Sequence, residues 1–246
     1  MDRLIYTAMT GANAAAHRQA VLANNLANAS TNGFRAELST YRAVPLRGDG
    51  ASTRVFALEA TSGHLDTPGS VQRTGRSMDA MATRNAWFSV QGLDGTESYT
   101  RNGSFEVSPD GTLMTSNGLT VLSDGGAPIT VPQNADVAIG QDGTLSAKVA
   151  GRPASVVGRL KMVTPAADDP LKRGDDGLFR TSSGDPLPND ASARLMAGVL
   201  EGSNVNPIEA MVGMIQTARQ FEVQMRLLQT AESNDRAAGQ LLGLQG

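Results

Sequence analysis

The chain has 246 residues, of which 40% are hydrophobic and 4% aromatic, and its formal net charge is -3. Globular proteins usually contain about 45–50% apolar residues, so we expect a thin core, or one spread over an elongated body, rather than a compact enzyme. The slight acidic excess disfavours binding to nucleic acid or to an anionic membrane, and the lack of cysteine excludes disulfides, thiolate metal sites and cysteine nucleophiles.

The N-terminal segment predicts a helix over residues 2–29. Small and apolar residues recur there at spacings of three and four, which keeps one narrow stripe on one side of a helix. The stripe consists of Ile5, Ala8, Ala12, Ala15, Gln19, Leu22, Leu26 and Ala29. Its alanines let a neighbouring helix approach closely, so the stripe predicts tight packing against a partner helix.

Three asparagines, Asn24, Asn25 and Asn28, cluster where this helix should end. Their amides can cap the helix or form hydrogen bonds to a neighbouring subunit, and the sequence leaves both interpretations open. The segment Thr31-Asn32-Gly33 then supplies a stop, because glycine readily adopts a positive φ.

The middle of the chain shows two patterns. Residues 36–85 have no sustained period and predict an extended, loop-rich connector. Residues 86–200 consist of short β-like runs separated by turn signals and predict an all-β domain. Those turn signals, which favour hairpins, are Asn102-Gly103, Asp110-Gly111, Asn117-Gly118 and Asp142-Gly143.

A second helix is predicted over residues 207–242. Asn206 is its N-cap, Pro207 its first residue and Glu209 its third, an arrangement typical of a capping box. A second stripe, rich in methionine, follows at helical spacing: Ile208, Met211, Ile215, Ala218, Phe221, Met225 and Leu228. The fold class predicted is α+β, with long N- and C-terminal helices packed as a coiled-coil-like layer and an all-β domain between them.

The sequence contains none of the common catalytic or nucleotide-binding motifs, and its two histidines, His17 and His64, have no partner pattern. We therefore predict no catalytic, cofactor-binding or metal-binding residues and no enzyme activity. No apolar run is long enough to cross a bilayer, and the first residues lack the continuous apolar core of a cleaved secretory signal, so direct membrane insertion is not expected either.

Three motifs resemble those of the bacterial flagellar rod and hook proteins. Residues 24–28 with Thr31, Gly33, Phe34 and Arg35 resemble the N-terminal signature of that family, and residues 198–206 resemble its C-terminal signature. Residues 99–105 together with 110–113 resemble the β-domain motif shared by the hook protein and the longer rod proteins. The resemblance therefore covers nearly the whole chain.

Within this family, residues 1–9, 41–45 and 173–180 resemble the proximal rod proteins. The distal rod protein is the main alternative, and its relatives usually carry Gln-Arg-Ala-Tyr-Glu where this chain has Ala218-Arg219-Gln220-Phe221-Glu222. One departure is Ala86, which stands where the family commonly has glycine. A left-handed turn before Trp87 would therefore require Asn85 to adopt that conformation.

The resemblance implies a structural subunit of the flagellar rod, the drive shaft that crosses the periplasm. It implies export by the flagellar type III apparatus without cleavage of a signal peptide, and assembly with copies of itself and other rod proteins. It implies no cofactor. Residues 1–35 and 201–246 would form the assembly core, 36–85 the connector and 86–200 the β domain.

The predicted assembly interface combines the two stripes with the motif residues. It consists of Ile5, Ala8, Ala12, Ala15, Leu22, Asn25, Leu26, Asn28, Phe34, Glu201, Asn204, Asn206, Met211, Ile215, Ala218, Phe221, Met225 and Leu228. In this interpretation Glu201, Asn204 and Asn206 fix the transition between the helical layer and the β domain.

Two alternatives come from other classes of protein. One is a soluble β-rich binding or adhesion module that uses its turns, with the two terminal helices paired only with one another. Two Arg-Gly-Asp tripeptides, at residues 47–49 and 173–175, are chance matches in turn-like contexts and do not argue for it. A hydrolase that uses aspartate carboxylates has no supporting cluster in the sequence. Circular dichroism of the dilute monomer discriminates the first alternative, since fully helical termini would favour a self-contained module.

Overall fold

The computed structural model describes residues 2–45, 55–166 and 168–243; the first Arg-Gly-Asp tripeptide, 47–49, lies outside them. The chain forms two compact units. Unit 1 comprises Met1–Ala29, Ala36–Leu65 and Val205–Gly246, and unit 2 comprises Ser30–Arg35 and Asp66–Asn204. A helix toward each end and many strands between them confirm the α+β class. The units divide the chain differently from the four predicted segments, because residues 30–35 belong with the β-rich unit and residues 36–65 belong with the helices.

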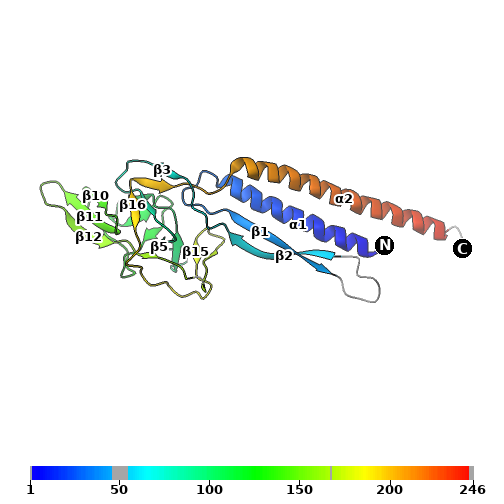
Figure 1. Cartoon of the computed structure of the whole chain (residues 1–246), viewed down its shortest axis with the longest axis horizontal. Coiled ribbons are helices and arrows are strands. Elements are labelled where there is room, and N and C mark those ends of the chain that lie inside the picture. The colour runs from blue at the N-terminus through cyan, green and yellow to red at the C-terminus, as the bar shows by residue number, and fades with distance from the viewer. Residues whose placement is uncertain (1, 46–54, 167, 244–246) are drawn as a thin grey trace. The chain divides into compact units, whose positions relative to one another are not determined.

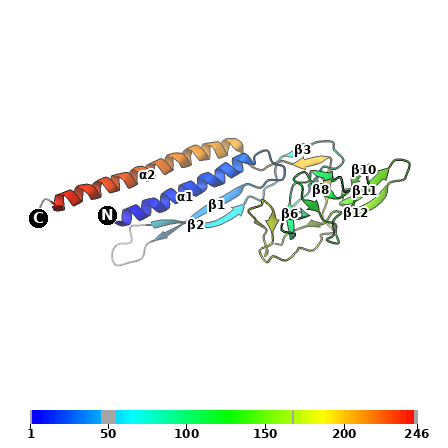
Figure 2. The same cartoon turned by 180° about the vertical axis from the view of Figure 1, so that it is seen from behind.

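Unit 1 contains two antiparallel helices and one hairpin. Helix α1 (Asp2–Ala27) lies between helix α2 (Pro207–Gly243) and the hairpin of β1 (Glu37–Pro45) and β2 (Val55–His64), as Figures 1 and 2 show from opposite sides. The helix bounds confirm the prediction to within two residues. The Asn206 side-chain oxygen accepts hydrogen bonds from the backbone N–H groups of Ile208 (3.1 Å) and Glu209 (3.4 Å), which confirms the predicted N-cap.

The hairpin corrects the prediction of a loop-rich connector over residues 36–85. Its strands pair from Glu37 opposite His64 to Pro45 opposite Val55, with a register shift at Thr40/Tyr41. The Tyr41 hydroxyl donates a hydrogen bond to the carbonyl oxygen of Ala14 in α1 at 2.9 Å. Because β1 residues are at most half-buried, the strand needs no strict apolar alternation, and the sequence pattern is correspondingly weak.

Unit 2 is built from short strands. They are β3 (Val71–Arg73), β4 (Ala80–Ala82), β5 (Trp87–Gln91), β6 (Glu97–Thr100), β7 (Phe105–Val107), β8 (Leu113–Thr115), β9 (Thr120–Val121), β10 (Ala135–Ile139), β11 (Thr144–Val149), β12 (Ser155–Arg159), β13 (Met162–Val163), β14 (Lys172–Arg173), β15 (Phe179–Arg180), β16 (Leu195–Ala197) and β17 (Val199–Glu201). These bounds confirm that the region from residue 86 to 200 is all-β.

The largest sheet of unit 2 has the order β14-β15-β6-β5-β9-β8-β7, with β13 also paired to β5. A separate sheet has the order β10-β11-β12, and two strand pairs, β16-β4 and β17-β3, stand apart from both. Strand β5 is buried on both faces, so Phe88 and Val90 enter the main core with Phe105 and Leu113, whereas Trp87 packs in a second cluster.

The predicted turns are confirmed in part. Gly111, Gly118 and Gly143 have φ values of 82°, 81° and 85°, as the Asp-Gly and Asn-Gly signals predict. Gly103 does not have a positive φ. Glycine fits at this position because a larger residue would clash: an added Cβ would lie 1.6 Å from the carbonyl oxygen of Ala80. Before Trp87 the left-handed residue is Arg84 (φ 55°), not Asn85.

Three apolar runs within residues 86–200 form strands only in part or not at all. The run over 155–163 is interrupted between β12 and β13, and the run over 193–200 is interrupted between β16 and β17 at Gly198, whose φ is 72°. Residues 129–131 form no strand, and only an isolated bridge joins Thr130 to Thr112. Short apolar runs specify burial, but the partner segment decides whether a ladder forms.

Candidate assembly interface

Helices α1 and α2 pack through small residues. Ala8, Ala12 and Ala15 of α1 are buried, and Ile5, Gln19, Leu22, Leu26 and Ala29 of the same predicted stripe are half-buried. A Cβ added to Gly11 would lie 3.0 Å from the amide carbon of Gln224, and one added to Gly213 would lie 3.2 Å from Leu22. In both contacts the residue numbers add to 235. A constant sum is expected when two antiparallel helices pack in a single register. Leu22 of the α1 stripe therefore packs against α2 of the same chain.

The face that α2 turns toward α1 shares Leu228 with the predicted methionine-rich stripe but otherwise differs from it. It is formed by smaller or less apolar residues at heptad-like spacing: Ala210, Gly213, Met214, Thr217, Gln224, Leu228 and Ala231. The members of the predicted stripe that are exposed are Ile208, Met211, Ile215, Ala218, Phe221 and Met225. Close approach to an alanine-rich helix favours small side chains, which Ala210, Gly213, Thr217 and Ala231 supply.

Four large apolar residues form an unusual surface, which we call the outer face of α2. Ile208, Met211, Val212 and Ile215 are 73%, 51%, 48% and 56% exposed. At about 100° per residue they occupy an arc of about 100° centred opposite Thr217, which is buried. Contiguous exposed apolar side chains of this kind mark interaction sites.

The asparagine cluster acts within the chain. Asn25 is buried, its Nδ2 donates to the carbonyl oxygen of Glu37 (2.9 Å), and its Oδ1 accepts from the N–H of Glu37 (2.8 Å). The Asn28 Nδ2 donates to the Asn24 carbonyl oxygen (2.9 Å), which caps the end of α1. Both amide atoms of Asn25 are thus used by its own chain, so its predicted contact is with β1 rather than with a neighbour.

A second stripe of α1, which was not among the predicted interface stripes, explains this contact. Ala14, Val21 and Asn25 are spaced by seven and four residues, and Val21 and Asn25 are buried. Ala14 and Asn25 both form hydrogen bonds to β1. The spacing of these residues is visible in the sequence, but an alanine-rich helix has several stripes of this kind. Which of them contacts β1 is decided by the position of the hairpin.

Replacing Asn25 by alanine is expected to destabilise unit 1 by about 1–3 kcal/mol, because it leaves the N–H and C=O of Glu37 without their partner. The measurement is thermal unfolding of the helical circular dichroism signal. The matched control is Asn24→Ala, since Asn24 is exposed and its side chain reaches Glu37 only at 3.5 Å. Equal melting temperatures for the two variants would contradict the assignment.

The two terminal motifs meet in unit 2 around a buried carboxylate. Glu201 Oε1 lies 2.6 Å from Arg35 Nη1, and Glu201 Oε2 accepts a hydrogen bond from Arg101 Nε at 2.9 Å. These three side chains, which we call the ion cluster, are each at most 2% exposed. Burial lowers the pKa of the Arg101 guanidinium, and the Glu201 charge opposes that shift.

Neighbouring groups hold the ion cluster in place. Arg101 donates to the carbonyl oxygens of Ala86 and, at 3.1 Å, of Arg84, and its guanidinium carbon lies 5.6 Å from the Trp87 ring centre. Arg84 has a left-handed backbone conformation, and its carbonyl oxygen accepts the hydrogen bond from Arg101. This hydrogen bond is a structural reason for the strained conformation. The β-domain motif is therefore joined directly to the C-terminal motif.

The remaining motif residues surround this cluster. Phe34 is buried, and the guanidinium carbon of Arg173 lies 4.3 Å from its ring centre. Gly33 has a φ of 72° and donates to the Glu201 carbonyl oxygen at 2.7 Å. Asn204 Nδ2 donates to the Thr67 carbonyl oxygen at 2.9 Å. Phe34 and Glu201 are thus internal contacts, not an outward surface.

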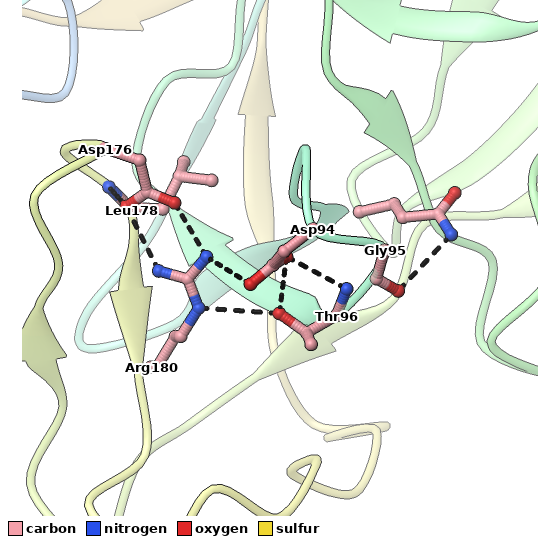
Figure 3. Close-up of polar contacts among 7 residues, drawn as sticks. Asp94, Gly95, Thr96, Asp176, Leu178 and Arg180 are labelled. Carbon is pink, nitrogen blue, oxygen red and sulfur yellow. Dashed lines mark hydrogen bonds and ion pairs between the residues drawn. The ribbon is translucent and has the colours of Figure 1, made fainter.

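Residues 173–180 form the hairpin of β14 and β15, shown in Figure 3. The Asp176 carboxylate accepts from the Leu178 N–H (3.1 Å) and from Arg180 Nη1 (3.0 Å), and Arg180 Nη2 also donates to Asp94 Oδ2 (3.3 Å). The hydrogen bond from Arg180 lowers the pKa of Asp176, and that from Thr96 lowers the pKa of Asp94. The second Arg-Gly-Asp tripeptide lies in this hairpin.

Unit 2 also has a polar cavity of about 520 Å³, lined by Thr83, Arg84, Asn85, Ala86, Thr164, Asp190, Ser192, Ala193 and Arg194. Its lining lacks the apolar and aromatic character of most small-molecule sites. Over the described residues, no three His, Asp or Glu side chains are placed to hold a metal ion. Neither helix, within the ranges described, has an apolar stretch that could cross a membrane.

Comparison with known families gives three matches along the chain. The family described as "Flagella basal body rod protein" matches residues 5–35, and "Flagellar hook protein FlgE/F/G D1 domain" matches residues 83–147. The family described as "Flagellar basal body rod FlgEFG protein C-terminal" matches residues 196–241. The first match contains the α1 stripe and the third contains the outer face of α2.

Curated relatives match over nearly the full length. The flagellar basal-body rod protein FlgF of Salmonella typhimurium is 46% identical over 99% of this chain and 100% of its own. FlgF of Caulobacter vibrioides is 31% identical over 99% of both chains. The flagellar basal-body rod protein FlgG of Buchnera aphidicola (subspecies Acyrthosiphon pisum) is 29% identical over 93% of this chain and 95% of its own.

Proposed function

The chain belongs to the FlgF family of flagellar basal-body rod proteins and is a structural subunit of the rod, and on this premise we propose that it polymerises through its terminal helices into the proximal part of the axial drive shaft. The observation that carries the proposal is the outer face of α2, a stripe of large apolar side chains that the chain's own α1 does not cover. Its partners are copies of itself and other rod proteins.

The energetics favour burial of this face in an assembly. The fully buried residues of the α1–α2 contact are alanine and threonine, and its larger apolar residues, such as Leu22 and Met214, are only half-buried, so the contact leaves apolar area exposed. Covering the four exposed side chains of the outer face would contribute on the order of 1 kcal/mol each, since Ile208 is 73% exposed and the other three are about half exposed. A heterologous contact of this kind, repeated about an axis without closing, generates a helical filament.

We propose that the terminal helices form a coiled-coil-like layer in the rod. The three-and-four spacing of buried residues on both helices and their single antiparallel register support this packing. In this layer Ile5, Ala8, Ala12, Ala15, Leu22 and Leu26 contact the chain's own α2. The contacts between subunits would be made by Met211, Ile215, Ala218, Phe221 and Met225, which are exposed in the single chain.

The place in the rod is inferred from the relatives. Identity is 46% and 31% to two FlgF proteins and 29% to a FlgG protein, which favours the proximal rod over the distal rod. We propose export by the flagellar type III apparatus without cleavage of a signal peptide, a position in the part of the rod that crosses the periplasm, and no catalytic role. Mass spectrometry of the N-terminus of the protein in isolated basal bodies tests the export proposal.

Deletion of the gene tests the function directly. A strain without this protein is expected to be non-motile and to yield basal bodies with incomplete rods in electron micrographs, and a plasmid copy is expected to restore both. Complete rods and normal swimming in the deletion strain would contradict the proposal. Antibody labelling of isolated basal bodies then distinguishes a proximal from a distal position.

A further inference from the structure

The chain passes between unit 1 and unit 2 four times, after residues 29, 35, 65 and 204. On the unit 2 side, the segments next to these points are bonded to one another. The Asn204 N–H donates to the Phe34 carbonyl oxygen (3.3 Å), and Asn204 Nδ2 donates to the Thr67 carbonyl oxygen (2.9 Å). Segments distant in sequence are therefore held together at one place in unit 2.

The ion cluster joins these segments. Arg35 is the last residue of its segment in unit 2, and Glu201 lies three residues before Asn204. Glu201 Oε1 also accepts a hydrogen bond from the Gly69 N–H (3.1 Å), and the Gly202 N–H donates to the Ser70 carbonyl oxygen (2.7 Å). The three segments are residues 30–35, 66–70 and 201–204. The Glu201 carboxylate, in the third segment, thus contacts Arg35 in the first, Gly69 in the second, and Arg101.

The segments at residues 66–70 and 201–204 are continuous with strands β3 and β17, which lie outside the main sheet of unit 2. Strands β3 and β17 pair only with each other, over three residues, and are not part of the eight-stranded sheet. An isolated two-stranded pair is marginally stable by itself. By contrast, Leu113 is completely buried in the main core of unit 2.

We propose that the ion cluster is a latch. When closed, it holds together the segments through which the chain passes from unit 2 to unit 1. When it opens, these segments separate while the main core of unit 2 stays folded. Neutralising Glu201 leaves two buried guanidinium groups facing each other, which favours the open state. The purpose of the latch rests on the proposed function: in a rod subunit, force carried along the chain between the units must pass through these segments.

Hydrogen exchange of the full chain tests the latch. In Glu201→Gln, the amides of Gly33, Gly69 and Gly202 are expected to exchange at least tenfold faster than in the wild type, while those of Leu113 and Leu122 are unchanged. The matched control is Glu97→Gln, which breaks another buried ion pair of unit 2, with Lys161 Nζ 2.7 Å from Glu97 Oε1. That control is expected to leave the three glycine amides unchanged.

Unchanged glycine exchange in Glu201→Gln, or equally fast exchange in the control, would overturn the latch. If Glu201→Gln fails to fold, Arg35→Lys takes its place, because it keeps the positive charge and loses the forked geometry. Faster exchange throughout unit 2 in Arg35→Lys would also overturn the latch, since the segments would then not open separately.

Swimming at two viscosities separates this idea from the proposed function. A strain carrying Glu201→Gln is expected to build rods, seen in isolated basal bodies, and to lose at least twofold more speed than the wild type when the medium is made more viscous. An equal loss would overturn the role of the latch under force and leave the rod function standing. Absence of the wild-type chain from basal bodies would instead overturn the proposed function.

Discussion

Replacing Ile215 by aspartate is expected to abolish the motility of a strain that has no other copy of the gene, while the isolated chain folds like the wild type. Ile215 is 56% exposed on the outer face of α2 and makes no part of the α1–α2 contact, so the monomer loses little. In an assembled rod, the same carboxylate would be buried among apolar side chains without a partner. That costs roughly 2 kcal/mol or more at every subunit, enough to prevent polymerisation.

The measurements are swarm diameter in soft agar and, for the purified variant, helical circular dichroism and its thermal midpoint. Gln220→Asp is the matched control, because it places the same residue at an exposed position of the same helix outside the outer face. It is expected to leave motility intact. Normal motility of Ile215→Asp, or equal loss in both variants, would show that this face is not the interface.

Leu26→Asp is also expected to stop assembly, but it is less informative. Leu26 is half-buried on the stripe that faces α2, so a charge there weakens the helix pair within the chain as well as any contact between chains. Its loss of motility would follow from either cause. The exposed position of Ile215 removes this ambiguity.

Replacing Gly103 by alanine is expected to destabilise unit 2 by about 3 kcal/mol or more. The added Cβ would lie 1.6 Å from the Ala80 carbonyl oxygen and 3.0 Å from the Phe88 ring. The Ala80 backbone cannot move away without breaking the hydrogen bond from its N–H to the Gly103 carbonyl oxygen (2.9 Å), and the Phe88 ring is held in the packed core. The cost thus combines overpacking with a lost backbone bond.

Chemical denaturation followed by tryptophan fluorescence measures this effect, because Trp87 is the only tryptophan of the sequence and is 2% exposed in unit 2. Gly125→Ala is the control, since no atom lies closer than 3.9 Å to its added Cβ and its φ is not positive. We expect that control to change the free energy of unfolding by less than about 0.5 kcal/mol. A similar value for Gly103→Ala would contradict the packing argument.

Local signals in the sequence were sufficient where the structure depends on neighbouring residues alone. Asn206 and Pro207 predicted the start of α2, because capping needs only the next few N–H groups. Gly111, Gly118 and Gly143 predicted positive φ for the same kind of reason. The resemblance of the terminal motifs to those of rod and hook proteins predicted the family, which the relatives confirm.

The candidate interface was predicted less completely. Both helices carry several stripes at helical spacing, and the sequence alone favoured the one on α2 with the largest apolar residues as the assembly surface. Whether these residues meet a neighbouring subunit stays a prediction. What the structure adds is that Met211 and Ile215 are free of α1, which makes them suitable for a test.

The sequence by itself determined the two helices, their ends, the all-β middle and the small-residue stripe of α1, because each depends on spacing and propensity along a few turns. Only the tertiary structure decided which face of α2 meets α1, that residues 37–45 pair with residues 55–64, and that Arg35, Arg101 and Glu201 share one buried site. These depend on contacts between segments far apart in the chain. Such contacts are chosen by shape and charge in three dimensions, which spacing along the sequence does not record.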